Sequence, residues 1–184
     1  MSALAKQKMT VDEFLAWAEG REGRYELIEG EVFAMSPQQV GHAFVKMRVV
    51  NALAAAISRA VLSCHAFPDG ITVRVNKFTA FEPDALVHYG DFPKLNALEV
   101  TNPIIVVEVL SPSSIRRDLT EKVAGYFQVE SILHYLIVDP EAAVIIYHSR
   151  SADGLFPPKI IRHGEIELTP PGLTLNAADL LLPV

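Results

Sequence analysis

Three ionisable side chains stand where the surrounding sequence calls for apolar ones. Glu108 interrupts PIIVVEVL, a run that otherwise predicts a strand buried on both faces. Asp84 comes at the start of the strand-like run ALVHY, and Lys122 falls on the apolar stripe of a helix predicted over 118–128. Burying an ionised carboxylate without a partner costs several kcal/mol. We therefore expect a cation to face Glu108.

Two acids on adjacent strands and a lysine on the following helix can converge on one point outside a sheet. Two carboxylates and a backbone carbonyl suit Mg²⁺, which keeps several waters, and an ammonium group nearby can orient one such water for attack on a phosphodiester. Each residue also has a plainer interpretation. Asp84 can cap a turn, Glu108 can belong to a structural ion pair, and Lys122 can extend past the stripe to pair with Asp118.

Capping residues and hydrophobic periodicity predict the elements that position these groups. TVDE is a capping box that starts a helix near residue 10, and Glu29-Gly30 is the turn of a hairpin. Alternating strands and helices indicate an α/β protein with a mixed central sheet, and we expect one domain over 1–184. Further helices are predicted over 38–62 and 118–128, and strands over 63–67, 71–75, 81–89, 103–110, 134–139, 143–148, 159–162 and 165–168.

The long helix over 38–62 is predicted from an apolar stripe at three- and four-residue steps. The stripe consists of Val40, Phe44, Met47, Val50, Leu53, Ile57 and Val61. The tail from Ser149 is richer in proline and glycine, and we expect it to be a peripheral addition to the core.

Composition narrows the class of protein. The chain has 184 residues, of which 50% are hydrophobic and 21% charged, as expected of one globular domain. Its formal net charge of −6 argues against coating nucleic acid through bulk charge. The single cysteine, Cys64, cannot form an internal disulfide and indicates a reducing compartment. The first twenty residues lack the apolar stretch of a signal peptide, so we expect a cytoplasmic protein.

Four segments together resemble a known family. FEPDALVHY, IIVVEVLSPSS, DLTEKVAGYF and HYLIVDP resemble a bacterial restriction endonuclease family within the PD-(D/E)xK nuclease superfamily. The resemblance runs from Arg24 to about Ile146, and its specific parts are EVLSPS and the spacing of Asp118, Lys122 and Tyr126. It implies a restriction-endonuclease-like core of helix, three strands, helix and strand. Around this core the chain adds an N-terminal hairpin and C-terminal strands.

The resemblance also implies roles for particular residues. Asp84 becomes the aspartate of the PD element and Glu108 the acid of the (D/E)xK element, and both would bind the metal with the carbonyl of Val109. Leu110 stands where the motif has its lysine, which is a departure from the pattern. Lys122 is the candidate for a lysine that has moved to the next helix. Further residues in family-typical segments could reach the same predicted metal site: Glu26, His42, Asp118 and Tyr126.

The segment SPSSIRRD offers groups that could hold phosphates just beyond Glu108. Hydroxyl and guanidinium groups suit this task, although a polar strand-to-helix connection capped by serines explains the same residues. The candidates are Ser111, Ser113, Ser114, Arg116 and Arg117.

The resemblance implies an Mg²⁺-dependent endonuclease that acts on DNA, with Mn²⁺ as a substitute metal. Because a symmetric pair suits the cutting of two strands, we also expect a homodimer. One alternative is an inactive protein of the same fold that serves as a binding module, which the acidic balance and the missing strand lysine favour. Another is a purely structural pair between Glu108 and Lys122.

Overall fold

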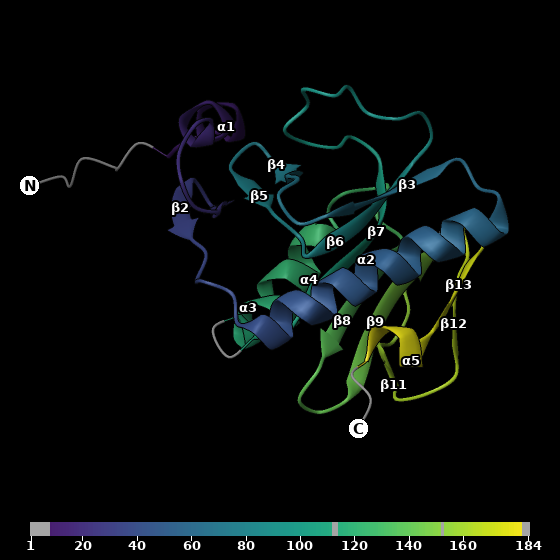
Figure 1. Cartoon of the computed structure of the whole chain (residues 1–184). Coiled ribbons are helices and arrows are strands. Elements are labelled where there is room, and N and C mark those ends of the chain that lie inside the picture. The colour runs from purple at the N-terminus through teal and green to yellow at the C-terminus, as the bar shows by residue number, and fades with distance from the viewer. Residues whose placement is uncertain (1–7, 112–113, 152, 182–184) are drawn as a thin grey trace, which may run out of the picture.

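The computed structural model describes residues 8–111, 114–151 and 153–181, which form two main sheets with helices around them (Figure 1). In chain order the elements are α1 (Val11–Ala18), β1 (Tyr25–Ile28), β2 (Glu31–Ala34), α2 (Val40–Ala60), β3 (Cys64–Pro68), β4 (Val73–Asn76), β5 (Thr79–Phe81), β6 (Ala85–Tyr89), β7 (Pro103–Val109), α3 (Ile115–Leu119), α4 (Glu121–Tyr126), β8 (His134–Asp139), β9 (Val144–Ser151), β10 (Gly154–Leu155), β11 (Lys159–Ile161), β12 (Glu165–Leu168), β13 (Leu173–Asn176) and α5 (Ala177–Leu180).

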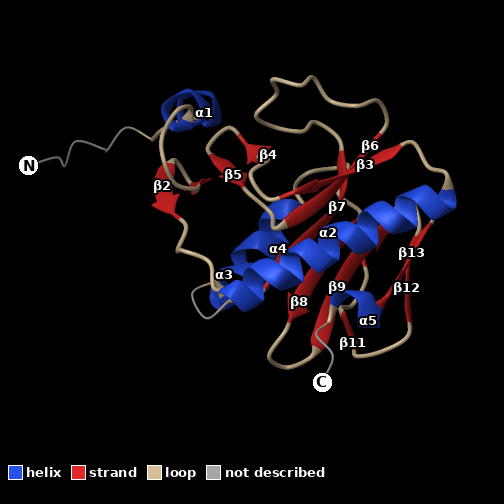
Figure 2. Ribbon diagram, viewed as in Figure 1, coloured by secondary structure: helices blue, strands red, loops and turns tan. Residues whose placement is uncertain are grey.

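The larger sheet is mixed and has the strand order β10-β9-β8-β7-β6-β3, with β11 on β9. β7 and β8 run parallel and the other neighbours along the sheet run antiparallel, which confirms the predicted fold class. All seven residues of β7 are buried, which explains its nearly continuous apolar run. α2 packs on one face of this sheet and α4 on the other (Figure 2). Side chains of β7 therefore alternate between two separate clusters, and Glu108 is directed to the α4 side.

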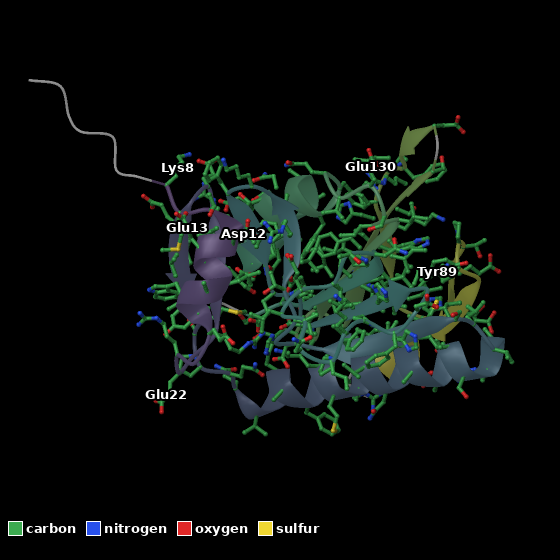
Figure 3. All side chains as sticks on the ribbon, turned by 90° about the horizontal axis from the view of Figure 1, so that it is seen from above. Lys8, Asp12, Glu13, Glu22, Tyr89 and Glu130 are labelled. Atoms are coloured by element: carbon green, nitrogen blue, oxygen red, sulfur yellow. The ribbon has the colours of Figure 1, made fainter. Side chains whose placement is uncertain are left out.

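The smaller sheet has the order β2-β1-β5-β4 and packs under α1. The predicted capping box is present, because Thr10 Oγ1 accepts from Glu13 N and the Glu13 carboxylate accepts from Thr10 N. Seen from above, α1 with Asp12 and Glu13 lies on the opposite side of the molecule from Tyr89 (Figure 3). β5 leads into β6 through residues 82–84, so Asp84 lies where the two sheets meet.

α2 buries a face that overlaps the predicted stripe only in part: Leu53 is buried as predicted, and Val50 and Ile57 pack partly buried against the same cluster. Val40 and Val61 are 88% and 89% exposed, and Phe44 and Met47 are about half exposed. The buried face consists of Val45, Lys46, Val49, Leu53 and Ala56. Apolar residues lie on both the buried and the exposed face of α2. Hydrophobic periodicity alone therefore does not predict which face packs on the sheet, and side-chain packing decides it. Among the described residues α2 is the one helix long and apolar enough to cross a membrane by length and composition, and one of its faces packs on the large sheet.

The helix predicted over 118–128 begins earlier and is divided in two. α3 and α4 meet at Thr120, whose backbone angles of φ −130° and ψ −74° interrupt the helix. Leu119, an apolar residue of the predicted helix, is 37% exposed. Lys122 lies inward, as its place on the stripe predicted, and Asp118 lies inward beside it, because both charges find partners inside.

The C-terminal segment belongs to the core, which corrects the expectation of a peripheral tail. Its apolar residues join the cluster that α2 forms with the large sheet. His134 helps to hold the segment, since His134 Nε2 lies 2.6 Å from Pro170 O and His134 Nδ1 lies 2.7 Å from Tyr147 Oη. The buried residues of the segment are Ile166, Leu168, Leu173, Leu175, Ala177, Leu180 and Leu181.

Candidate active site

Asp84 and Glu108 stand side by side where β6 begins and β7 ends. The antiparallel register pairs Ala85 with Val107, and continuing it outward places Asp84 opposite Glu108. Val109 N donates to Asp84 Oδ2 at 2.7 Å. Both acids are buried, with 4% and 2% of their surface exposed. The structure thus brings together the two acids and the Val109 backbone that the sequence predicted as metal ligands.

Glu108 is held by side chains of α4. Lys122 Nζ donates to Glu108 Oε1 at 2.7 Å, and Tyr126 Oη donates to the same oxygen at 2.6 Å. The ammonium group also lies 2.8 Å from Glu26 Oε1 and 3.4 Å from Asp118 Oδ1. Lys122 is therefore shared by three carboxylates that come from β1, β7 and α3.

The surrounding charges keep Lys122 protonated. Burial by itself would lower the pKa of Lys122, but Glu108, Glu26 and Asp118 outweigh it and raise that pKa well above the ordinary value. Burial raises the pKa of Glu108 despite the Lys122 ammonium, and it likewise raises the pKa of Asp118. Lys122 is consequently a fixed positive charge rather than a proton acceptor.

His42 and Lys46 reach Asp84 from the other side, on α2. His42 Nε2 lies 2.7 Å from Val109 O and 3.7 Å from Asp84 Oδ2, and because a carbonyl only accepts, Nε2 carries a hydrogen. Lys46 Nζ lies 2.8 Å from Asp84 Oδ1 and also contacts Asp69 Oδ2. The accessory position predicted for His42 is thus close to both candidate ligands.

The cluster of charged side chains around Asp84 and Glu108 contains more acidic than basic residues. Most of its side-chain acceptors are carboxylate oxygens, the hard ligands that Mg²⁺ and Mn²⁺ prefer. Counted as ionised, six acidic and four basic side chains leave a formal surplus of two negative charges. They are Glu26, Asp69, Glu82, Asp84, Glu108 and Asp118 against Arg24, Lys46, Arg117 and Lys122.

The Asp118 carboxylate has few hydrogen-bonding partners. Within the described parts of the chain, the Asp118 carboxylate is buried and its contacts are long, the ion pair with Lys122 Nζ measuring 3.4 Å. The donor set therefore fits a divalent cation by its chemistry, although no three His, Cys, Asp or Glu side chains of the described residues already form a ligand group.

The predicted phosphate-binding serines form a local turn. Ser111 N lies 3.2 Å from Ser114 Oγ, and the two hydroxyl oxygens are 3.1 Å apart. This arrangement matches the plainer interpretation of a capped connection between β7 and α3. Ser113 lies outside the described residues.

The two predicted arginines differ in position. Arg116 is exposed. Arg117 Nη1 lies 3.5 Å from Glu26 Oε2, and its guanidinium lies 5.2 Å from the centre of the Phe33 ring. Arg117 therefore lies at the border between the buried acids and solvent, while Arg116 faces outward.

A sequence match decides the family. Residues 11–180 match the Uma2 family, whose description is "Putative restriction endonuclease". The chain belongs to the Uma2 family. The match spans every candidate site residue and confirms the resemblance inferred from the motifs.

Two relatives of this Uma2 chain are informative. It is 24% identical over 148 residues to "Uncharacterized protein slr1290" of Synechocystis, which covers 80% of this chain and 77% of the relative. A crystal structure described as "a putative nuclease belonging to DUF820" from Anabaena variabilis matches with a TM-score of 0.75 and 17% identity, over 94% of this chain and 97% of that one. At this identity the second match shows that the two proteins share a fold.

The Uma2 chain keeps a lysine beside Glu108 although Leu110 takes the motif's lysine position. Leu110 is 7% exposed and packs with Val106 and Tyr126 on the α4 side of the sheet. Lys122 reaches Glu108 from α4 in its place.

The groups around Asp84 were not among the residues predicted from the sequence. The position of Lys46 near the site was predictable, because Lys46 lies four residues after His42 and so shares its side of the helix. The position of Asp69 was not predictable, since Asp69 lies in a Pro-Asp-Gly turn that only folding brings to Asp84. Two further missed residues complete this side: Arg24 Nη1 lies 2.7 Å from Asp69 Oδ2, and Arg24 Nε bonds Glu82 Oε1.

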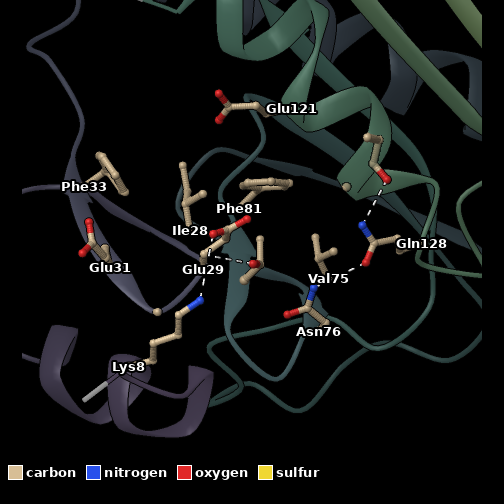
Figure 4. A pocket seen from close by; sticks show the side chains of 14 residues that line it. Lys8, Ile28, Glu29, Glu31, Phe33, Val75, Asn76, Phe81, Glu121 and Gln128 are labelled. Carbon is tan, nitrogen blue, oxygen red and sulfur yellow. Dashed lines mark hydrogen bonds and ion pairs between the residues drawn. The ribbon is translucent and has the colours of Figure 1, made fainter. Parts of the chain in front are cut away.

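A cleft of about 700 Å³ lies next to the site but does not contain it (Figure 4). Phe81 lines the cleft, and its ring centre lies 5.7 Å from Lys122 Nζ. Neither Asp84 nor Glu108 lines this cleft, and its carboxylates would repel a phosphate. These carboxylates are Glu29, Glu31 and Glu121.

Proposed function

We propose that this Uma2 protein is a metal-dependent nuclease that hydrolyses phosphodiester bonds in DNA. The observation that carries the proposal is the placement of Asp84 and Glu108 opposite each other, beside the Val109 backbone, at one end of β6 and β7. The family match supports nuclease chemistry. The charge surplus of the cluster supports the requirement for a divalent cation.

Asp84, Glu108 and the Val109 carbonyl would hold Mg²⁺ or Mn²⁺. Such an ion, when bound, supplies an acidified water and offsets negative charge in the transition state. Lys122 and Tyr126 both bind Glu108 Oε1, so they orient this carboxylate without engaging Oε2. The fixed charge of Lys122 adds to the positive potential that a phosphorane requires.

Partly exposed side chains mark where a nucleic acid would approach. The exposed fractions of the side chains are 15% for His42, 29% for Asp69 and 33% for Arg117. Arg116 and Arg117 can contact phosphates there, because guanidinium groups bind them well.

Cleavage assays with labelled DNA test the proposal. We expect the parent protein to cleave in the presence of Mg²⁺ or Mn²⁺ and to stop when EDTA removes the metal. Asp84→Asn and Glu108→Gln should each abolish cleavage, because each removes a metal ligand. The matched control is Glu165→Gln, an exposed carboxylate on β12 that should leave the rate unchanged.

Cleavage by the double variant Asp84→Asn/Glu108→Gln at the parent's rate would refute the assignment. Circular dichroism must show that the variants are folded, since both acids are buried. Parallel assays on RNA and on single-stranded DNA identify the substrate.

The alternative of a binding module is favoured by one observation, namely that lysines already occupy oxygens of Asp84 and Glu108. A binding module would retain DNA affinity in both acid variants and would cleave under no metal condition. A homodimer and a cytoplasmic location stay predictions, and light scattering on the purified protein measures the first.

A further inference from the structure

Lys46 occupies the oxygen of Asp84 that faces α2. Its ammonium group is almost fully buried, with 5% of the residue exposed, and lies 2.8 Å from Asp84 Oδ1. The other oxygen, Asp84 Oδ2, accepts from Val109 N. Both oxygens of this candidate ligand are thus already engaged.

The same ammonium group has a second acceptor. Lys46 Nζ contacts Asp69 Oδ2, and Asp69 is fixed independently by Arg24 Nη1 at 2.7 Å and Gln38 Nε2 at 3.0 Å. Asp69 would therefore stay in place if Lys46 left Asp84. Its side chain is 29% exposed, so this acceptor lies on the solvent side of the ammonium group.

A divalent cation cannot share Asp84 Oδ1 with Lys46. Mg²⁺ binds oxygens at about 2.0–2.1 Å, so an ion on Oδ1 would lie within a few ångströms of Nζ. Two cations at that separation repel strongly where little water screens them. Glu108 is different, because Lys122 and Tyr126 both use Oε1.

We propose that Lys46 takes the place of the metal: it neutralises Asp84 in the metal-free protein, and when a divalent cation binds it releases Asp84 and keeps its contact with Asp69. The inference rests on the metal site of the proposed function, and it adds that Lys46 competes with the divalent cation for Asp84. It makes metal affinity depend on the balance between two carboxylates that compete for one ammonium group.

Calorimetric titration with Mn²⁺ tests the exchange without reference to cleavage. Lys46→Met should raise the affinity for Mn²⁺ by about tenfold or more, because it removes the competing cation. Asp69→Asn should lower the affinity by about tenfold, since Lys46 then has only Asp84 as an acidic partner. Loss of a charge near the site would by itself give these signs, so the sizes of the two effects must be compared with that of a charge control.

Arg24→Met is the matched control for net charge. It removes one positive charge from the same network, but Arg24 pairs with Asp69 and Glu82 rather than Asp84. We expect its effect to be clearly smaller than that of Lys46→Met. Equal effects would show that only net charge matters and would overturn the exchange.

The outcomes separate the two proposals. Binding of Mn²⁺ by the parent, together with unchanged or weaker binding by Lys46→Met, overturns the exchange and leaves the metal site intact. Absence of binding in both proteins overturns the metal site and the exchange together. Thermal denaturation with and without Mn²⁺ shows whether each variant is folded, and Lys46→Gln provides a second variant if Lys46→Met is not.

Discussion

Lys122 is the residue on which the buried cluster depends most directly. One ammonium group neutralises parts of Glu108, Glu26 and Asp118, and 3% of Lys122 is exposed. Removing one partner from a buried ion pair is far more damaging than replacing the whole pair, because it leaves uncompensated charge behind.

We therefore predict that Lys122→Met lowers the free energy of unfolding by about 3–5 kcal/mol. Urea denaturation at pH 7 measures the change. Lys94→Met, at an exposed lysine, is the control and should change stability by no more than about 0.5 kcal/mol. A loss for Lys122→Met as small as that of the control would mean that the cluster has alternative cations.

The contribution of Lys122 to folding stability should decrease at alkaline pH. The pKa of Lys122 is raised in the folded state, so the folded protein holds this proton more tightly than the unfolded chain. The contribution to stability is complete below the ordinary value of 10.5 and is lost as pH rises above it. Burial raises the pKa of Tyr126 and Tyr135 as well, and their effect has the same direction.

Unfolding monitored between pH 9 and 12 should accordingly show stability falling from about pH 10.5 upward. Lys122→Met should fall less steeply over the same interval, because it has lost one of the groups that release a proton. An identical slope in both proteins would assign the alkaline transition to the tyrosines alone.

At the scale of elements, close packing of α4 on β5 sets the position of Lys122 and Tyr126. A Cβ atom added at Gly125 would lie 2.5 Å from Phe81 Cε2, which is too close. The Phe81 ring in turn packs edge to face on Tyr126, with 5.2 Å between ring centres. Gly125 therefore lets the helix approach closely enough for its side chains to reach Glu108.

Gly125→Ala should destabilise the protein by about 1–3 kcal/mol through this overpacking. Gly41→Ala on α2 is the matched substitution, since nothing lies within 4 Å of the added Cβ. It should stabilise the protein by about 0.4–1 kcal/mol by restricting the unfolded chain. Thermal melts of the two variants should move in opposite directions, and equal shifts would contradict the packing argument.

At the scale of the whole molecule, the site forms where two sheets and three helices meet. β1 supplies Glu26, the ends of β6 and β7 supply Asp84 and Glu108, and α2 supplies Lys46. The C-terminal segment stabilises α2 from outside the site through apolar contacts. Damage to that segment should thus reach the site through the global stability of the fold.

The β12–β13 hairpin tests this idea with two neighbouring residues. Leu175 is 1% exposed, whereas Thr174 beside it is exposed. Leu175→Asp should cost about 3 kcal/mol or more, because it buries an unpaired charge. Thr174→Asp should stay within about 0.5 kcal/mol. Similar stabilities for the two variants would mean that the hairpin is peripheral, as the sequence had predicted.

The amino-acid sequence by itself determined the candidate site residues Asp84, Glu108 and Lys122 and most elements that hold them. Glu108 and Lys122 were recognisable because a charge within an apolar pattern needs a buried partner, and the capping box and strand runs are local signals. The four family-like segments are likewise visible in the sequence alone.

Only the tertiary structure decided which face of α2 is buried, where the C-terminal hairpin packs, and which groups surround Asp84. The physical reason is that these features depend on contacts between segments distant in the chain. Two apolar faces of one helix are equivalent until a sheet packs against one of them. Lys46 and Asp69 are separated by 23 positions and meet only after the chain has folded.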